Sequence, residues 1–154
     1  MTETKTTKKT FWDRTAVLYD RFMRKDAAAY ETMYDLMQPV VKDRVVLELA
    51  TGTGLIAKHL LNSARMIEAT DASPEMIAQA KKDCLSTKVH FSVQDMFHLP
   101  YSGEAFDIVI VSNALHIVPQ PELALTEIHR VLKSDGILIA PTFTHAQNSL
   151  RGKV

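Results

Sequence analysis

The segment 50–54, with the sequence ATGTG, holds two of the five glycines in this chain. It lies between an apolar run and a helical pattern, where glycine lets the backbone turn sharply and approach a ligand without a Cβ in the way. The helix after the turn would present free N–H groups to the same ligand. The alternative is a turn that binds nothing, because many strand-to-helix turns contain glycine. The segment indicates a binding loop but does not identify the ligand.

Carboxylates follow two further apolar runs. Asp71 stands nineteen residues after Gly52, where a carboxylate can accept hydrogen bonds from both vicinal hydroxyls of a ribose. Alternatively, Asp71 only helps to start the helix that Ser73 and Pro74 open. Asp95 follows the next apolar run and can accept a hydrogen bond from the exocyclic amine of adenine. The two carboxylates and the glycine loop together favour a nucleoside ligand.

The class of nucleotide depends on the other groups near the loop. Residues 52–57 also fit the pattern G-x-G-x-x-A, which is the nicotinamide-dinucleotide fingerprint. Glu48 lies just before the loop, where dinucleotide-binding folds generally keep the strand apolar. With Asp95 nearby, the site is rich in acids, which suits a ligand that carries a cation and lacks phosphates.

Short apolar runs alternate with helical patterns along the chain. This alternation predicts βαβ units, a parallel sheet and right-handed crossovers that place helices on both faces. The expected strands are 45–49, 66–70, 89–93, 106–111 and 137–140. The expected helices are about 53–63, 73–84, and one that Pro121 starts and Gly136 ends. The fold class is therefore α/β, an open doubly wound sheet whose ligands bind beyond the carboxyl ends of the strands.

The first forty residues differ from the rest of the chain. Residues 1–9 carry no apolar periodicity and are predicted to be a disordered tail. Residues 10–40 are predicted to form a helical cap, with one helix from Thr10 and a second from Asp26 that Pro39 halts. Residues 41–154 would then form the sheet domain.

Composition restricts the function classes. The 154 residues include eighteen Lys+Arg and eighteen Asp+Glu, which is the material of one domain with no basic excess for nucleic acid. No apolar run approaches the ~20 residues of a membrane span. The six histidines form no i, i+4 pair on a helix and Cys84 is the single cysteine, so we expect no metal site and no disulfide. These features predict a soluble cytoplasmic protein.

Five motifs in register identify a family that this chain resembles. They lie in residues 46–54 (VLELATGTG), 70–76 (TDASPEM), 94–100 (QDM with LP), 106–116 (FDIV through SNALH) and 131–136 (VLK to Gly). Their order and spacing are similar to those of class I S-adenosylmethionine-dependent methyltransferases, in particular the small-molecule branch that includes ubiquinone/menaquinone-biosynthesis methyltransferases. The resemblance covers about residues 10–145 and implies a Rossmann-like sheet of strand order 3-2-1-4-5.

The resemblance also implies an activity. S-adenosylmethionine would be the cofactor, S-adenosylhomocysteine the product, and a small molecule the methyl acceptor. Glu48 and the loop would hold the methionine moiety; the loop residues concerned are Ala50, Thr51, Gly52 and Gly54. The family commonly has glycine where this chain has Ala50. The extra methyl at a place of close approach would weaken cofactor affinity or displace the loop slightly.

The remaining roles follow from the same resemblance. Asp71 would bind the ribose, and Ala72 or Met76 would flank the adenine. Asp95 and the backbone at Met96 would contact the edge of the adenine ring.

Three further residues belong to the predicted site. Asn113 would lie under the methionine end near the sulfonium, and Tyr19 matches an N-terminal helix that closes over the cofactor. Tyr19 could equally be a core residue. His116 stands at a strand end and could act as a general base, although a histidine there is more often a wall of the pocket.

Members of this family normally have a seven-stranded sheet, whereas the sequence here provides five strands. We therefore expect a fragment that lacks strands 6 and 7, with the fifth strand left as an exposed edge through which the protein could form a homo-oligomer. The alternatives to an active methyltransferase are a domain that binds the cofactor without turnover and a nicotinamide-dependent oxidoreductase.

Overall fold

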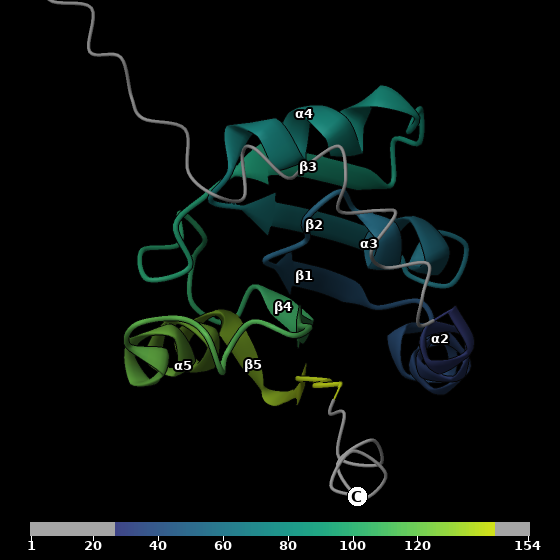
Figure 1. The fold of residues 1–154 in the computed structure, drawn as a ribbon. Coiled ribbons are helices and arrows are strands. Elements are labelled where there is room, and N and C mark those ends of the chain that lie inside the picture. The colour runs from purple at the N-terminus through teal and green to yellow at the C-terminus, as the bar shows by residue number, and fades with distance from the viewer. Residues whose placement is uncertain (1–26, 144–154) are drawn as a thin grey trace, which may run out of the picture.

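The computed structural model describes residues 27–143, and their fold is a five-stranded parallel sheet flanked by helices (Figure 1). The strands are β1 (Val45–Leu49), β2 (Met66–Asp71), β3 (Val89–Val93), β4 (Phe106–Val111) and β5 (Leu132–Ile139). The strand order is β3-β2-β1-β4-β5, which confirms the predicted topology. The order reverses between β1 and β4, so the carboxyl ends of these strands border the crevice where ligands of such sheets bind.

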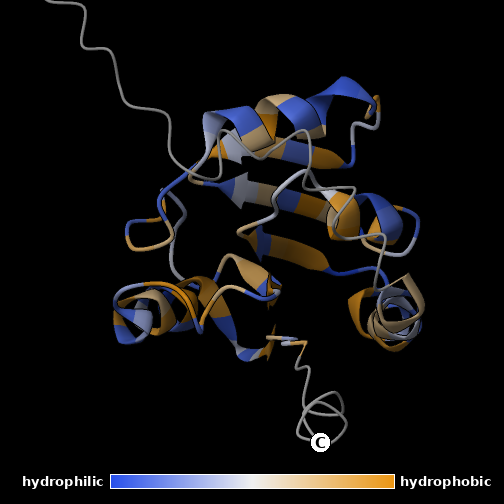
Figure 2. Ribbon diagram, viewed as in Figure 1, coloured by the Kyte–Doolittle hydropathy of each residue, from blue (hydrophilic) through white to orange (hydrophobic). Residues whose placement is uncertain are grey.

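The central strands are apolar on both faces because each face packs against helices. Alternate residues point to opposite sides, so Val46 of β1 joins one core cluster and Leu47 joins the other. In β4, Ile108 and Val109 divide in the same way. Figure 2 shows apolar residues along β1 and a hydrophilic outer surface on α4 (Pro74–Lys82).

The helices form a layer on each side of the sheet. Helices α2 (Ala27–Val41), α3 (Leu55–Leu60) and α4 contribute to one core cluster, and α5 (Pro121–Val131) contributes to the other. Figure 1 shows α5 and α2 on opposite sides of β4 and β5. None of the helices in residues 27–143 is long and apolar enough to cross a membrane.

Helix α2 continues past the proline that was predicted to halt it. Pro39 lies inside α2, which ends at Val41. A proline in the last turn removes only one helical hydrogen bond, and the continuation buries Val41 completely in the core. The apolar side chains that recur every three or four residues along α2 are buried; they are Tyr30, Met33, Tyr34 and Met37. The helix expected from Thr10, the cap at Asp26, and Tyr19 all lie outside the described residues.

The start of the fifth strand was also predicted wrongly. Gly136 does not end a helix: α5 ends at Val131 and β5 begins at Leu132. Leu132 pairs with Phe106, and the register then shifts before Ile137 pairs with Ile108. This bulge places Gly136 inside the strand, where a Cβ would lie 2.8 Å from Leu132 Cδ2.

Smaller differences concern the ends and faces of other elements. Helix α3 is shorter than expected, and Cys84 lies beyond the end of α4. Val93 of β3 and Leu125 of α5 are 45% and 43% exposed, although both lie in elements with an apolar pattern. The division of the chain into a tail (1–9), a cap (10–40) and a sheet domain (41–154) stays a prediction.

Candidate ligand site

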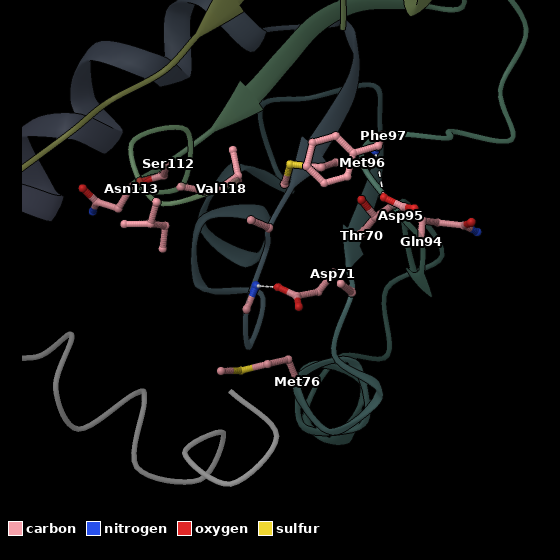
Figure 3. A pocket seen from close by; sticks show the side chains of 15 residues that line it. Thr70, Asp71, Met76, Gln94, Asp95, Met96, Phe97, Ser112, Asn113 and Val118 are labelled. Carbon is pink, nitrogen blue, oxygen red and sulfur yellow. Dashed lines mark hydrogen bonds between the residues drawn. The ribbon is translucent and has the colours of Figure 1, made fainter. Parts of the chain in front are cut away.

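A cavity of about 210 Å³ lies at the carboxyl ends of β1 to β4. Figure 3 shows Asp71 in the hollow, with Asp95 and Phe97 on one side and Ser112 and Asn113 on the other. Eight of the predicted site residues line it: Ala50, Gly52, Asp71, Ala72, Met76, Asp95, Met96 and Asn113. Parallel strands bring these residues together, because their carboxyl ends meet at one edge of the sheet.

The glycine loop has left-handed backbone at three positions. Gly52 and Gly54 have φ of 61° and 80°, which glycine adopts without strain. Ala50 has φ of 53°, which costs a residue with a Cβ roughly 1–2 kcal/mol. The expected effect of Ala50 on cofactor affinity stays a prediction. Gly54 does not line this cavity or the smaller one beside Glu48. A Cβ at Gly54 would lie 2.7 Å from the Phe91 ring, so packing requires glycine at this position.

Asp71 ties the glycine loop to the start of α4. Its Oδ2 accepts a hydrogen bond from the Gly52 N–H at 2.8 Å, and its Oδ1 accepts one from the Ser73 N–H at 2.9 Å. The carboxylate therefore helps to start the helix, which was the alternative role. An ionised carboxylate accepts more than two hydrogen bonds, so the same group can also accept from a ligand in the cavity.

Asp95 shapes the opposite wall of the cavity. Its Oδ1 accepts a hydrogen bond from the Phe97 N–H at 2.9 Å, and its Oδ2 lies 3.3 Å from His98 Nδ1. The Asp95 side chain is 58% exposed. The turn that Asp95 closes places Met96 and Phe97 against the cavity (Figure 3).

A second, smaller cavity of about 20 Å³ lies beside Glu48. Glu48 is 2% exposed, and its Oε2 accepts a hydrogen bond from the Thr51 hydroxyl at 2.7 Å. Burial raises the pKa of Glu48 to about 8, and the negative charge of Asp71 acts in the same direction. Hydrogen bonds from Thr51 and from the Ala57 backbone oppose this shift without cancelling it. Tyr30 of α2 forms part of the same cavity wall.

Three residues line both cavities: Ala50, Ser112 and Asn113. Asn113 also has left-handed backbone, with φ of 50°. Its N–H donates to the Pro141 carbonyl at 2.9 Å, and its Oδ1 accepts from the Phe143 N–H at 2.8 Å. Asn113 therefore fixes the segment after β5 next to the end of β4.

Several lining residues were not predicted. In the larger cavity they are Thr70, Gln94, Phe97, Ser112, Ala114, Ile117 and Val118; in the smaller they are Tyr30, Leu55, Ile56 and Ser112. Phe97 and Ser112 each follow directly on a predicted strand end or site residue, which could have indicated them. Of the predicted residues, His116 is exposed and lines neither cavity.

The electrostatics of the site favour a ligand that carries positive charge. Glu48, Asp71 and Asp95 all face one of the two cavities, and within residues 27–143 neither cavity is lined by lysine or arginine. A pyrophosphate would find no cationic side chain on these walls. The charges on these walls therefore favour a ligand with a cationic group and no phosphates.

Comparison with known proteins identifies a domain and a group of relatives. The family model described as "Methyltransferase domain" matches residues 47–140. The ubiquinone/menaquinone biosynthesis C-methyltransferase UbiE of Bartonella henselae is 32% identical over 126 residues, which is 77% of this chain and 48% of that protein. The chain thus spans about half the length of the curated relatives it matches.

Two solved structures have a similar fold. A complex of DhpI with SAH superimposes with a TM-score of 0.76 at 26% identity, over 89% of this chain and 68% of that chain. A protein of Methanococcus maripaludis gives a TM-score of 0.80 at 19% identity, over 99% of this chain and 76% of that chain. The latter similarity concerns the fold alone.

Proposed function

This chain belongs to the class I S-adenosylmethionine-dependent methyltransferase family, and from this membership we propose that it binds S-adenosylmethionine and transfers the methyl group to a small-molecule acceptor. The observation that carries the proposal is the acid-lined pair of cavities at the carboxyl ends of β1 to β4. The cofactor combines an uncharged nucleoside with a cationic amino-acid half, and the described residues of these walls include acids and no lysine or arginine.

The cofactor would lie across both cavities. In this arrangement the ribose hydroxyls bind Asp71, the adenine lies between Met76 or Ala72 and the Asp95–Met96 turn, and the methionine half points toward Glu48. The loop residues Ala50, Thr51 and Gly52 and the strand end at Asn113 would surround the methionine half; Gly54 would support the loop from below. Tyr19, outside the described residues, stays a predicted contact.

Orientation is the main catalytic contribution that these residues can make. The sulfonium methyl is intrinsically electrophilic when the cofactor is bound. In-line alignment of acceptor, methyl carbon and sulfur, with water excluded, can supply much of the acceleration. We assign no general base, because His116 is exposed and lies on neither cavity wall.

The small-molecule acceptor is inferred from the Bartonella henselae relative, whose name is that of a C-methyltransferase of ubiquinone and menaquinone biosynthesis. The main alternative is a domain that binds the cofactor without turnover, because the chain spans about half the length of those relatives. Turnover is tested by S-adenosylhomocysteine release with quinol, phenol and amine acceptors. Cofactor binding without release under any of these conditions would favour the alternative.

Calorimetric titration with S-adenosylmethionine, S-adenosylhomocysteine and NAD tests the cofactor class. We expect the first two to bind and NAD not to bind, since no cationic side chain of the described residues faces either cavity. Binding of NAD alone would show that the nicotinamide fingerprint at residues 52–57 is the correct interpretation.

The ribose contact has a separate test in Asp71→Ala. We expect the affinity for S-adenosylhomocysteine to fall at least tenfold, because charge-assisted hydrogen bonds to the ribose are lost and the loop loses its tie to Gly52. The 2′,3′-dideoxy analogue separates these effects. Removing the ribose hydroxyls should weaken binding to the unaltered protein much more than to the variant, and equal weakening would exclude a direct contact.

Location and assembly are also proposals. The single cysteine fits a reducing compartment, which supports a cytoplasmic protein. Strand β5 stands at the edge of the sheet and Ile137 is 48% exposed there, which supports self-association through this edge. Sedimentation of the protein and of Ile137→Lys tests this: a dimer that the substitution dissociates is expected, and a concentration-independent monomer contradicts it.

A further inference from the structure

Basic residues gather at the amino ends of β1, β2 and β3, at the end of the sheet opposite the cavities. In Figure 1 the arrowheads of β1 and β2 point to the left, and the connections that enter the three strands lie together at the right. The bases lie in these connections and in the last turn of α4. We call them the basic surface: Lys42, Arg44, Arg65, Lys81, Lys82 and Lys88. All are exposed except Lys88, which is half-buried.

Backbone hydrogen bonds hold the three connections next to one another. The Arg44 carbonyl accepts from the N–H groups of Arg65 at 2.9 Å and Met66 at 3.4 Å. The Lys88 carbonyl accepts from the Ile67 N–H at 2.8 Å. The cations that come from separate parts of the chain are therefore neighbours along one end of the sheet.

The charge of the basic surface is not neutralised within residues 27–143. None of its side chains is in an ion pair with another described residue, whereas Lys133 of β5 pairs with Asp107 at 2.9 Å. Asp107 lies near Arg44 but is already bound by Lys133. The acids within the same connections are Asp43 and Asp83. A positive excess remains here, although the chain as a whole has no net charge.

The connection between α4 and β3 also exposes a leucine. Leu85 is 98% exposed, and in the sequence it lies between Lys82 and Lys88. Met66, beside Arg65, is 46% exposed. An apolar side chain this exposed gains from burial only when the protein contacts something else.

Cations beside an exposed leucine fit an anionic lipid surface better than they fit a nucleic acid. Lysine and arginine are attracted to anionic headgroups, and leucine enters the boundary between headgroups and acyl chains. Single-stranded nucleic acid is bound by cations together with aromatic rings that stack on the bases. The large apolar residues exposed in 27–143 include no phenylalanine, tyrosine or tryptophan. A nucleic acid would also leave Leu85 in water.

We propose that the basic surface is a docking site for an anionic lipid bilayer, with Leu85 inserted among the headgroups. The opposite end of the sheet carries the carboxylates of Asp71 and Asp95, which an anionic bilayer repels. The bound chain would therefore keep its cavities open to water. This inference goes beyond the proposed function and does not depend on methyl transfer.

Co-sedimentation of the full chain with vesicles tests the proposal. We expect binding to vesicles of equal parts phosphatidylcholine and phosphatidylserine, and none to phosphatidylcholine alone. Arg65→Glu/Lys88→Glu should weaken binding at least about twentyfold, because each cation near an anionic leaflet strengthens binding roughly fivefold. A second pair, Lys42→Glu/Lys82→Glu, should have a similar effect. Leu85→Ser should weaken binding about tenfold through the loss of apolar burial.

Two variants serve as matched controls. Lys8→Glu/Lys9→Glu makes the same charge change outside the described residues and should leave most of the binding. Leu123→Ser removes a leucine that is 48% exposed in the first turn of α5, at the other end of the sheet, and should bind vesicles like the unaltered chain. The melting temperature of each variant shows whether it is folded.

Several outcomes would overturn the inference. They are equal binding to both kinds of vesicle, binding to neither, and binding that Lys8→Glu/Lys9→Glu abolishes while both pairs in the basic surface retain it. Full binding by Leu85→Ser would exclude insertion into a bilayer. A duplex oligonucleotide or polyglutamate that binds the basic surface more tightly than the vesicles do would assign that partner instead. Vesicle binding is measured without cofactor, so a failure of S-adenosylhomocysteine to bind would contradict the proposed function alone.

Discussion

Glu48 is an acid buried on the wall of the smaller cavity, and its protonation couples ligand binding to pH. Its pKa is raised to about 8 by burial, so the carboxyl is mostly protonated at neutral pH in the ligand-free protein. A cation bound beside it favours the ionised form and lowers this pKa. The groups that interact with it are the hydroxyl of Thr51, the backbone of Ala57, the carboxylate of Asp71 and the phenol of Tyr34.

We predict that binding of S-adenosylmethionine releases a proton near pH 7 and strengthens as the pH rises toward about 8. Calorimetry in buffers of different ionisation enthalpy measures the proton directly. In Glu48→Gln the release should disappear. A release of equal size in Glu48→Gln would show that another group titrates.

The same pKa affects the stability of the ligand-free protein. The folded protein binds the proton of Glu48 more tightly than the unfolded chain does, because the pKa of this carboxyl in the unfolded chain is near 4.5. The stabilisation is therefore complete below about pH 4.5 and is lost as the pH rises through about 8. Chemical unfolding at several pH values should show this loss, and Glu48→Gln should remove it.

Ala50 offers a second prediction at the level of a single residue. Ala50→Gly relieves the left-handed strain, at the cost of a more flexible unfolded chain, so the free energy of unfolding should rise by about 0.5–1 kcal/mol. Ala78→Gly, on the exposed side of α4, is the matched control and should lower it by about 0.5–1 kcal/mol. Destabilisation by both would mean that the Ala50 methyl contributes packing that outweighs the strain.

At the level of elements, helix α5 holds the loop that forms the Asp95 side of the cavity. Arg130 donates hydrogen bonds to the carbonyls of Tyr101 (2.7 Å) and Leu99 (3.1 Å), and the Glu127 carboxylate accepts one from the Leu99 N–H (2.8 Å). Glu127 and Arg130 also bind each other at 2.7 Å. The interaction with Arg130 lowers the pKa of Glu127 to about 2, so this ion pair stays charged well into the acid range.

We predict that Arg130→Ala weakens the affinity for S-adenosylhomocysteine roughly fivefold, about the effect of one net hydrogen bond, because the loop behind Met96 is released. Arg130→Lys keeps the charge but cannot form both carbonyl contacts, so it should behave like Arg130→Ala. Substitution of the exposed Arg65 by alanine is the control for lost charge. Full affinity in Arg130→Lys would indicate that the positive charge holds the loop and that the two guanidinium hydrogen bonds to the loop carbonyls are not required.

The elements that the sequence predicted well are those whose ends depend on local chemistry. Strands β1 and β4 begin and end at the residues that their apolar runs predicted, and the Ser73-Pro74 cap forms as expected, with Ser73 accepting from the Met76 N–H. The predictions that Pro39 and Gly136 end helices were wrong, because the backbone structure around both residues depends on tertiary contacts. Burial of Val41 extends α2, and a register shift against β4 draws Gly136 into β5.

Among the site residues, too, those set by local sequence were predicted and those set by tertiary contacts were not. Asp71 and Asp95 were predicted because they come directly after strands, and strand ends meet at one edge. Ile117 and Val118 were missed because a turn after β4, in which both N–H groups donate to the Ala114 carbonyl, brings them to the cavity.

Over the whole molecule, the site joins the carboxyl ends of four strands that come from separate parts of the chain. A ligand that binds only the folded protein stabilises it by RT ln(1 + [L]/Kd), about 2.7 kcal/mol at one hundred times Kd. For a chain of this length, that corresponds to a rise in melting temperature of roughly 5–10 °C.

We predict that S-adenosylhomocysteine raises the melting temperature by this amount and that adenosine at the same concentration raises it less, because adenosine reaches only the larger cavity. Scanning fluorimetry across a concentration series measures both shifts. Equal shifts for adenosine and S-adenosylhomocysteine in the unaltered protein would place the whole binding energy in the larger cavity and leave the Glu48 cavity without a part in cofactor recognition.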